Sequence, residues 1–419
     1  MSALMSVIRF SAVHRRVPVA LGACLLSFVA FWAAQRAADV SMLDLMVYRA
    51  EGATVRAGGD LYALRTTYAQ LPATYPPFAA LLFTPLTLFG TGTMRTLATA
   101  GNLALLVALV HLSLKLVGHA RVESTLWGAA VVVWCEPVWT TLRYGQINLL
   151  IAVLVMWDLA HRSPAGRARW AGVGLGLAAA IKLTPGLFVI FLAATGLAAY
   201  VRGAGGGPWL RHARGAVGAF AGATLLAAAV LPYDSWRFWT EMVFRTSRVG
   251  YAEETGNQAL RGVVARLLHT PEPGAPWFAL AVLVAVAGLS VAVAAELRGE
   301  RAWAVTACAV TALLVSPVSW SHHWVWCVPL VLVLWTSGLR AAALGALLVF
   351  CSYALWWVPH SYGRPELHQN ALELTLSMLY GVVGCAFLVL TAASGRGPAE
   401  VAGVPEAAEV RPSRMSRTA

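Results

Sequence analysis

The residues best suited to chemistry lie in one polar stretch near the start of the chain, residues 39–78. This stretch holds four carboxylates, three arginines and four tyrosines, whereas 59% of the whole chain is hydrophobic. On a helix that begins near residue 42, Asp44, Tyr48 and Glu51 fall on one side and apolar side chains on the other. We expect the polar side of this helix to face a cleft. A carboxylate that is partly removed from water in a cleft can accept a hydroxyl proton as a general base. A structural role for Asp44, capping or pairing at a helix end, is the alternative.

Two further polar positions stand at the ends of apolar runs. Lys182 precedes a helix break at Pro185, so its ammonium either reaches the headgroup region or binds an anion such as a lipid phosphate. Gln146 and Asn148 follow Gly145 in a turn between two apolar runs. Their amides either hold sugar hydroxyls or cap the next helix.

A third polar cluster contains two adjacent histidines, His322 and His323, between Trp320 and Trp324. Neighbouring side chains point in different directions in regular structure, which disfavours a metal site built on both imidazoles. We expect one imidazole to meet a phosphate and the other to pack with the tryptophans, which could also stack on a sugar. The sequence predicts no metal and no cofactor.

The motifs and charges of the chain disfavour several classes of protein. The sequence contains no P-loop, G-x-G-x-x-G, H-E-x-x-H or nucleophile elbow, which argues against a nucleotide-driven pump, a dinucleotide enzyme and a zinc protease. Lys and Arg outnumber Asp and Glu by 31 to 19, but they form short clusters between apolar runs. This pattern is typical of cytoplasmic loops in membrane proteins rather than of nucleic-acid binding. The six cysteines show no C-x-x-C spacing and are expected to be packing residues.

The elements that must position these residues are membrane-spanning helices. Long apolar runs without the alternation of a β-barrel predict an all-α polytopic membrane protein. With the first run retained as a helix, and not removed as a signal peptide, the positive-inside rule gives about twelve spans with both ends in the cytoplasm. The expected helices cover residues 17–38, 97–117, 124–142, 146–161, 169–184, 186–201, 214–232, 276–297, 303–317, 323–338, 341–358 and 371–392.

Two long outer loops belong to this topology, residues 39–96 and 232–275. The apolar segment from Pro76 to Gly90 in the first loop is short and rich in proline, so we expect it to be re-entrant rather than a full span. Three apolar side chains at helical spacing predict a short amphipathic interfacial helix in the second loop. They are Trp236, Trp239 and Val243.

The domain organisation follows from the same pattern. Residues 1–392 are expected to form a single transmembrane domain. Residues 393–419 are rich in Ala, Gly, Pro, Glu and Arg and predict a disordered cytoplasmic tail.

Seven short motifs carry a resemblance to a known family. They are Asp44-x-x-x-Tyr48, Gly59-Asp60-Leu61-Tyr62, Tyr75-Pro76-Pro77-Phe78, Gly145-Gln146-Ile147-Asn148, Lys182-x-x-Pro185, Gly256-Asn257-Gln258 and the run from Ser319 to Trp324. In this order they resemble glycosyltransferase family 87, the actinobacterial membrane mannosyltransferases with the C-type fold. The similarity extends over most of the chain, from about residue 17 to 392. The pattern is closest to mycobacterial enzymes that add α-1,2-linked mannose to phosphatidylinositol mannosides or to lipomannan.

This resemblance implies transfer of mannose from a polyprenyl-phosphate-mannose donor to a hydroxyl of an acceptor glycolipid, with inversion at the anomeric carbon. The reaction would take place on the extracytoplasmic face of the cell membrane, among membrane lipids and without nucleic acid. Asp44 would be the catalytic base, and Lys182, His322 and His323 would meet the donor phosphate. The residues expected to contact substrate are Tyr48, Tyr62, Tyr75, Gln146, Asn148, Asn257, Gln258, Trp320 and Trp324.

Two alternatives stay open at this point. One is an arabinofuranosyltransferase of the same fold that uses decaprenyl-phosphate-arabinose, and the other is a transporter or flippase of lipid-linked sugar. A transporter is expected to show repeat symmetry and polar groups near the membrane midplane, whereas here the polar groups gather at one predicted face. The first loop also lacks the Asp-x-Asp pair of many C-type transferases, so a lysine or histidine could neutralise the phosphate in place of a metal.

The predicted topology can be tested by labelling single cysteines in intact cells. Cysteines placed at positions 60, 146 and 255 should react with an impermeant reagent from outside, and one at position 165 should not. If position 146 reacted only from the cytoplasm, the segment from Pro76 to Gly90 would be a full span.

Overall fold

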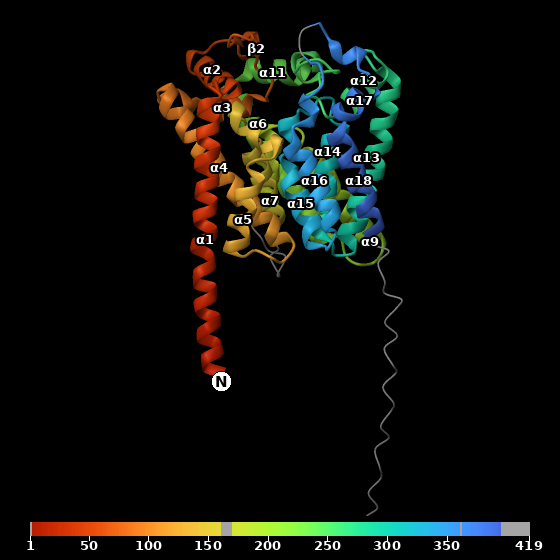
Figure 1. Ribbon diagram of the computed structural model, residues 1–419. Helices are drawn as coiled ribbons and strands as arrows, with labels where there is room; N and C mark the ends of the chain where they lie inside the picture. Colours follow the sequence, from red (N-terminus) through yellow and green to blue (C-terminus); the bar gives the residue numbers. More distant parts are fainter. Residues whose placement is uncertain (1, 161–169, 361–362, 395–419) are drawn as a thin grey trace, which may run out of the picture.

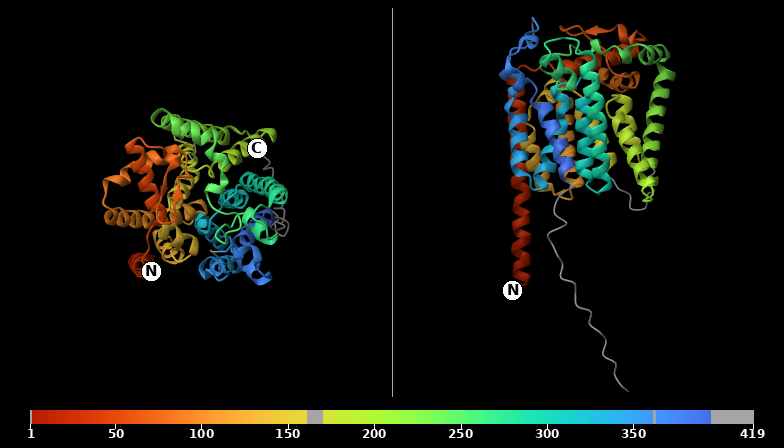
Figure 2. Two further views of the ribbon diagram at one scale, coloured as in Figure 1. Left: turned by 90° about the horizontal axis from the view of Figure 1, so that it is seen from above. Right: turned by 90° about the vertical axis from the view of Figure 1, so that its right-hand side faces the viewer.

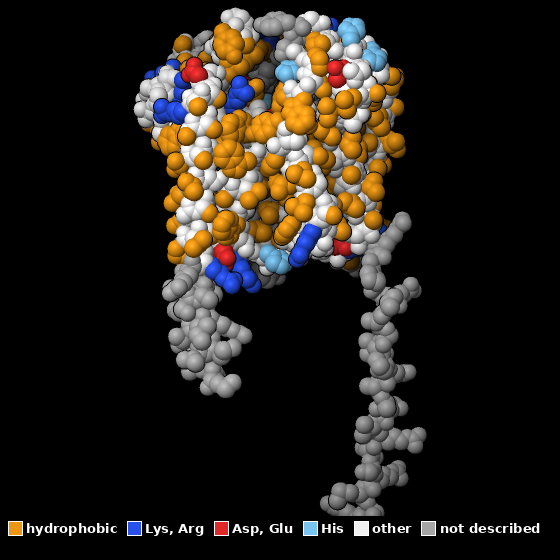
Figure 3. All heavy atoms as spheres, viewed as in Figure 1, with side chains coloured by type: hydrophobic (Ala, Val, Ile, Leu, Met, Phe, Trp, Pro, Cys, Tyr) orange, Lys and Arg blue, Asp and Glu red, His pale blue; other side chains and the backbone are white. Residues whose placement is uncertain are grey.

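The helices of the computed structural model stand side by side and meet a layer of short elements at one end (Figure 1). The structure describes residues 2–160, 170–360 and 363–394. The predicted basic run at 161–169 and the predicted tail from residue 395 lie outside this described part. On the face drawn in Figure 3, hydrophobic side chains cover the middle of the molecule and charged side chains gather toward its two ends. A bilayer requires this distribution of side chains.

Thirteen of the described helices make up the body below this layer. They are α1 (Ser2–Ala37), α4 (Thr91–Leu116), α5 (Val122–Val132), α6 (Glu136–Tyr144), α7 (Asn148–Ala160), α8 (Val173–Ile181), α9 (Gly186–Val201), α10 (Gly207–Val230), α13 (Gly274–Leu297), α14 (Arg301–Val315), α15 (Cys327–Thr336), α16 (Arg340–Ser352) and α18 (Leu379–Ser394). Seen from above, the elements up to α7 lie mostly on one side and those from α13 onward on the other (Figure 2).

Shorter elements cover one end of this body, which we call the capped end. They are α2 (Leu43–Ala57), η1 (Leu61–Ala63), the hairpin of β1 (Arg65–Thr66) and β2 (Leu71–Pro72), α3 (Pro77–Phe83), η2 (Thr84–Leu88), α11 (Pro232–Thr240), η3 (Met242–Phe244), η4 (Thr246–Arg248), α12 (Leu260–Leu267), η5 (Ser321–Trp326), η6 (Ala354–Trp356), η7 (Pro365–His368) and α17 (Ala371–Ser377). The N-terminus of α1 points to the opposite end (Figure 1).

Fewer of the described helices are long enough to span a membrane than the sequence suggests, and several are broken. Among the described residues, four helices are long and apolar enough to cross a membrane, or up to six spans exist if the bent pairs α6–α7 and α17–α18 each count as one. These helices mark a polytopic membrane protein, but about twelve spans are not confirmed. The expected helix 124–142 is divided into α5 and α6, because Pro137 lacks the N–H that would continue the helix across the break.

The positive clusters that guided the topology fall at turns between neighbouring helices. Residues 119–121 join α4 to α5, residues 202–206 join α9 to α10, and residues 298–300 join α13 to α14. The helices of each pair contact each other along their length. This arrangement agrees with helical hairpins whose turns carry the basic residues.

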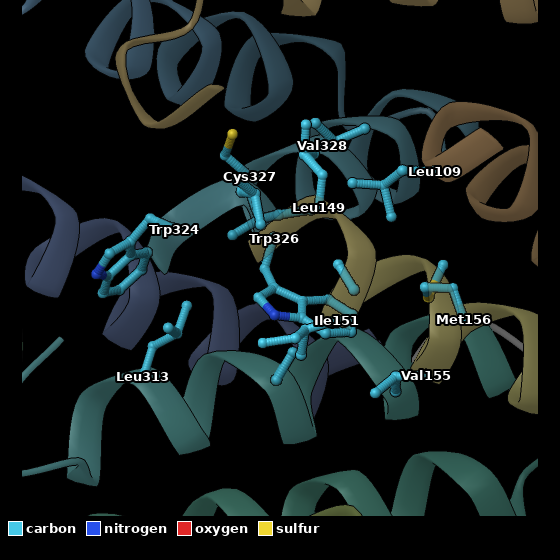
Figure 4. Packing of buried hydrophobic residues seen from close by; sticks show 14 of the residues in the cluster. Leu109, Leu149, Ile151, Val155, Met156, Leu313, Trp324, Trp326, Cys327 and Val328 are labelled. Carbon is cyan, nitrogen blue, oxygen red and sulfur yellow. The ribbon is translucent and has the colours of Figure 1, made fainter. Parts of the chain in front are cut away.

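Packing around α7 holds the body together. Leu149 and Val155 of α7 are completely buried and meet Leu109 of α4, while Trp326 and Cys327 close the cluster from η5 and α15 (Figure 4). Lipid tails are as apolar as these side chains, so the stabilisation comes from dispersion and close fit rather than from exclusion of water.

The two outer loops are fastened to each other at the capped end. The short helix predicted around Trp236 is present as α11. Arg237 of this helix donates to Asp60 Oδ2 at 2.5 Å, and Asp234 Oδ1 accepts the backbone N–H of Leu61 at 3.0 Å. These contacts hold the first loop against the second over the body.

The proline-rich segment forms two short helices, α3 and η2, between Pro77 and Leu88. Twelve residues are too few to cross a bilayer of about 30 Å as a helix. The segment packs closely under α2, since a Cβ on Gly52 would lie 2.5 Å from the carbonyl oxygen of Phe83. Its re-entrant position in a membrane stays a prediction.

A buried carboxylate joins four separate elements below the capped end. Glu136 Oε1 accepts hydrogen bonds from Thr140 at 2.7 Å, Ser321 at 2.8 Å and Trp356 Nε1 at 3.0 Å, and its Oε2 accepts one from Tyr380 at 2.8 Å. Glu136 has no exposed surface. It therefore ties α6 to η5, η6 and α18 through charge-assisted hydrogen bonds.

Removal of this acceptor should destabilise the fold strongly. Glu136→Ala leaves four buried donors unpaired, which we expect to cost about 3 kcal/mol or more. Thr140→Val removes a single donor and should cost only about 1 kcal/mol. Thermal unfolding in detergent, followed by tryptophan fluorescence, compares the two variants. Equal unfolding midpoints would show that Glu136 does not organise these elements.

Candidate active site

The main cavity of the described structure lies at the capped end and has a volume of about 1430 Å³. Its wall combines α2, the turn between α6 and α7, the residue that follows α8, and the stretch that leads into η5. Eight residues predicted from the sequence line it: Asp44, Tyr48, Tyr75, Gln146, Lys182, Trp320, His322 and His323. Side chains far apart in the sequence thus share one space.

Asp44 is positioned by the first turn of α2 and by the neighbouring α6–α7 turn. Gln146 Nε2 donates to Asp44 Oδ2 at 2.6 Å. Gly145 makes this approach possible, since its φ is +67° and a Cβ there would lie 2.6 Å from the Leu45 side chain. Burial raises the pKa of Asp44 to about 6, against the opposing effects of the Gln146 hydrogen bond and the Lys182 charge. The carboxyl group therefore titrates close to neutral pH, as a general base should.

Glu51 lies about two turns further along α2 and has a different environment. Its side chain is almost completely buried, and its Oε1 has no hydrogen-bond partner. Burial and, secondarily, the charge of Asp44 raise the pKa of Glu51 to about 8. Glu51 is thus protonated at neutral pH and does not compete with Asp44 as a base.

Gln146 also organises two tyrosines of the wall. Its Oε1 accepts hydrogen bonds from the hydroxyls of Tyr48 at 2.7 Å and Tyr75 at 3.2 Å. Tyr62 lies outside the cavity wall and donates to the carbonyl oxygen of Tyr75 at 2.9 Å. Tyr62 therefore positions Tyr75, whereas the sequence suggested a direct contact with substrate.

Lys182 stands at the end of α8 within a set of polar partners. Its Nζ lies 3.2 Å from Asn148 Oδ1, 2.9 Å from His323 Nε2 and 5.5 Å from the centre of the Tyr75 ring. Asn148 in turn donates from Nδ2 to the carbonyl oxygen of His322 at 3.0 Å. These partners hold the lysine head within the cavity.

The hydrogen bonds of His323 determine where the protons of this pair lie. The backbone N–H of Trp320 donates to His323 Nδ1 at 3.2 Å, which leaves the imidazole proton on Nε2. The Nε2–H donates to Lys182 Nζ when the lysine is a neutral amine. Burial lowers the pKa of Lys182 to about 7, so the charged form that lowers the pKa of Asp44 is populated as well. An anion that enters the cavity favours the protonated lysine, because it supplies the negative charge that the amine lacks.

Both histidines line the cavity, where the residue pattern alone led us to expect one imidazole at a phosphate and the other packed with tryptophans. The two rings are perpendicular with centroids 4.8 Å apart, and His322 also meets the Tyr144 ring edge-on at 5.5 Å. The helix η5 is a 3₁₀ helix, whose tight turn lets both neighbours border one broad space. Trp324, expected to stack on a sugar, is completely buried against Tyr380.

Asn257 and Gln258 lie behind the wall and hold it in place. Asn257 Oδ1 accepts the backbone N–H of Ser319 at 3.0 Å, and the backbone N–H of Gln258 donates to the Ser319 carbonyl at 2.8 Å. Gln258 Nε2 donates to the carbonyl of Ser377 at 2.6 Å. Both amides are completely buried, so they fix the stretch before η5.

Several cavity residues were not predicted from the sequence. The outer part of the wall carries Arg143, Arg245, Arg248 and Arg364, beside Glu253 and Glu254. Arg143 lies in the last turn of α6, Arg248 in η4 and the others in connecting segments. Their spacing in the sequence is not distinctive, so no sequence signal identifies them. Glu136, which lies below the cavity, did have a signal, because a carboxylate inside an apolar run usually has a structural or functional partner.

Within the described ranges, no group of three or more His, Cys, Asp or Glu side chains is arranged to hold a metal ion.

Apolar helices that end in one large cavity, with a carboxylate, a lysine and two histidines in its wall, fit a membrane enzyme. The family model described as glycosyltransferase family 87 matches residues 73–317, more than half of the chain. The chain belongs to glycosyltransferase family 87 and is a glycosyltransferase. The matched region contains Gln146 and Lys182 but not Asp44. A role for Asp44 is therefore supported by its position in the cavity and not by the family match.

Curated relatives cover most of the chain. It is 35% identical over 308 residues, 69% of this chain and 68% of the relative, to the polyprenol-phosphate-mannose-dependent alpha-(1-2)-phosphatidylinositol mannoside mannosyltransferase of Mycobacterium tuberculosis. It is 34% identical to the protein of that name from Mycolicibacterium smegmatis, with 83% and 82% covered. It is 30% identical to a phosphatidylinositol pentamannoside mannosyltransferase of Mycobacterium tuberculosis, with 85% and 82% covered. No solved structure matches the chain.

The pH dependence of the transfer rate should report the environment of Asp44. A base with a pKa of about 6 is ionised above that pH, so the rate should rise through pH 6 and then level off. Gln146→Leu removes the hydrogen bond that lowers this pKa, so the rise should move to higher pH. Tyr75→Phe is the control, because its hydroxyl contacts Gln146 Oε1 and not the carboxylate. Initial rates measured across pH compare the three proteins, and an unshifted rise in Gln146→Leu would contradict the assignment.

Proposed function

We propose that the protein transfers mannose from polyprenyl-phosphate-mannose to a mannoside hydroxyl of a phosphatidylinositol mannoside, forming an α-1,2 linkage with inversion. The observation that carries this proposal is the shared cavity of Asp44 with Lys182 and His323. An inverting displacement needs a base for the acceptor hydroxyl and positive charge for the leaving phosphate. The names of the curated relatives support the choice of donor and acceptor.

The proposed step balances within the cavity. The acceptor oxygen attacks the anomeric carbon and forms the new glycosidic bond, while Asp44 takes the hydroxyl proton. The bond between that carbon and the phosphate oxygen breaks, and polyprenyl phosphate leaves with the electron pair. Lys182, protonated in the presence of the phosphate, and His323 Nε2–H would then donate to the phosphate oxygens.

A small side cavity supports a lipid-linked donor. It has a volume of about 40 Å³, shares Lys182 and His323 with the main cavity, and is bordered by Ile151, Phe188 and Leu313. Apolar residues lie directly behind the proposed phosphate site, where a polyprenyl chain would begin, and this wall must widen as the chain enters, because the cavity is smaller than one isoprenyl unit. A nucleotide site is unnecessary, because polyprenyl phosphate is itself the leaving group.

The outer part of the cavity supports an anionic, sugar-bearing acceptor. Arg143, Arg245 and Arg248 provide positive charge there, and Tyr251 and Trp356 provide aromatic faces. A phosphatidylinositol mannoside carries both a phosphodiester and mannose, so it fits this combination better than a neutral glycan does. Lipomannan remains the second candidate acceptor.

The setting of the reaction is part of the same proposal. The basic clusters at the helix turns favour the capped end as the extracytoplasmic face of the plasma membrane, with the C-type fold and about twelve crossings in total. Short helices such as α8 and α15 would then cross as broken or tilted segments beside longer neighbours.

Replacement of the base tests the mechanism, and two donors test the substrate. Asp44→Asn should reduce mannose transfer by about 10² to 10⁴-fold, because it removes general base catalysis, while donor binding is retained. Asp39→Asn is the matched control, since Asp39 is exposed and lies outside the cavity wall. Membranes that contain each protein are supplied with radiolabelled polyprenyl-phosphate-mannose or decaprenyl-phosphate-arabinose.

An active Asp44→Asn protein would place the base elsewhere. Arabinose transfer without mannose transfer would assign the other donor and contradict the proposed substrate. Donor uptake without any transfer by the unmodified protein would favour a flippase.

A further inference from the structure

A second cavity lies on the opposite face of α2 from the main cavity. It has a volume of about 370 Å³ and is bordered by α2, the tip of the β1–β2 hairpin and the first turns of α4. Leu43 borders both cavities, while Asp44 borders only the first and Met46 only the second. Helix α2 is thus the wall between the two spaces.

Two arginines give this second cavity its chemical character. Arg49 of α2 and Arg95 of α4 both line it, and no carboxylate does. Arg49 Nη2 donates weakly to the carbonyl of Phe89 at 3.4 Å, and Arg95 Nη2 donates to the carbonyl of Ser41 at 2.8 Å. Among the described residues, neither arginine forms an ion pair. Two guanidinium groups therefore share a cavity without a counter-charge.

Unpartnered polar atoms are concentrated at the same cavity. The Nε atoms of Arg49 and Arg95 and the hydroxyl of Thr67 are buried without a hydrogen-bond partner. Thr67 also has a φ of +66°, which is costly for a β-branched residue and usually persists where a ligand or tight turn requires it. Two guanidinium groups and a hydroxyl can supply several donors to one tetrahedral oxyanion, and arginine matches phosphate geometry well.

We propose that this second cavity binds the phosphodiester of an anionic membrane lipid. Exposed apolar side chains that could pack against a lipid tail occur close by in the sequence of its elements: Phe89, whose carbonyl accepts from Arg49, and Leu88 and Leu97 are each at least 41% exposed. Positive side chains also gather near the capped end above the hydrophobic middle of the face drawn in Figure 3. The lipid bound here is neither donor nor acceptor, since α2 separates it from Asp44. Its binding would fix the helix that carries the base.

Lipid retention by purified full-length protein tests this site. The protein is placed in nanodiscs of phosphatidylcholine that contain a minor fraction of phosphatidylglycerol, released from them, and its bound lipids are counted by native mass spectrometry. The double variant Arg49→Gln, Arg95→Gln should retain one phosphatidylglycerol fewer than the unmodified protein. Arg56→Gln is the matched control, because Arg56 is an exposed arginine of α2 outside all three cavities. Equal retention by all three proteins would overturn the proposal.

A measurement on the unmodified protein does not depend on the folding of a variant. Short-chain phosphatidylglycerol should raise the thermal unfolding midpoint in detergent more than short-chain phosphatidylcholine does, because it binds only the folded state. Equal midpoints with the two lipids would contradict the site. If inorganic phosphate raised the midpoint as much as phosphatidylglycerol, the cavity would be a site for free phosphate and the lipid assignment would fail.

Discussion

The approach of the α6–α7 turn to α2 is the contact on which the active site depends. Gly145 has a left-handed backbone conformation and no side chain to collide with Leu45, so the turn can lie directly against the first residues of α2. The next residue, Gln146, then reaches Asp44 with its amide nitrogen and two tyrosines with its amide oxygen. One amide side chain thereby fixes the orientation of the carboxylate and sets part of its pKa.

Buried polar groups also hold the opposite wall of the cavity, which is formed by η5. Thr141 and Asn148 both donate to the carbonyl of His322, at 2.8 and 3.0 Å, and Ser321 donates to the buried Glu136. These bonds fix the backbone of η5 before any substrate arrives. Donors that are already oriented need little reorganisation when charge develops in the transition state. Burial of the Glu136 carboxylate costs free energy, and the four hydrogen-bond donors around it offset that cost.

The sequence predicted several of the polar residues that line this cavity, but not how the wall behind them is built. Asp44, Lys182 and the two histidines were expected at one face because of their polarity in apolar surroundings, and they line one cavity. Asn257 and Gln258 have the same polarity but point into the wall, and a sequence cannot show which way an amide in a loop is turned. The breaks within the expected helices were missed for a related reason. Apolar runs predict burial in hydrocarbon or protein alike, and breaks such as that before Glu136 depend on tertiary partners.

The placement of charge explains why the two walls belong to one mechanism. In the proposed reaction the donor is a phosphodiester and the leaving group a phosphate monoester, so negative charge on the phosphate grows as the glycosidic bond to it breaks. A protonated Lys182 beside it stabilises that growth more than it stabilises the bound donor, which is the condition for catalysis. Asp44 loses its charge in the same step when it accepts the hydroxyl proton. The reaction therefore moves one negative charge across the cavity toward Lys182 and creates no new uncompensated charge, which a site of low dielectric constant would strongly oppose.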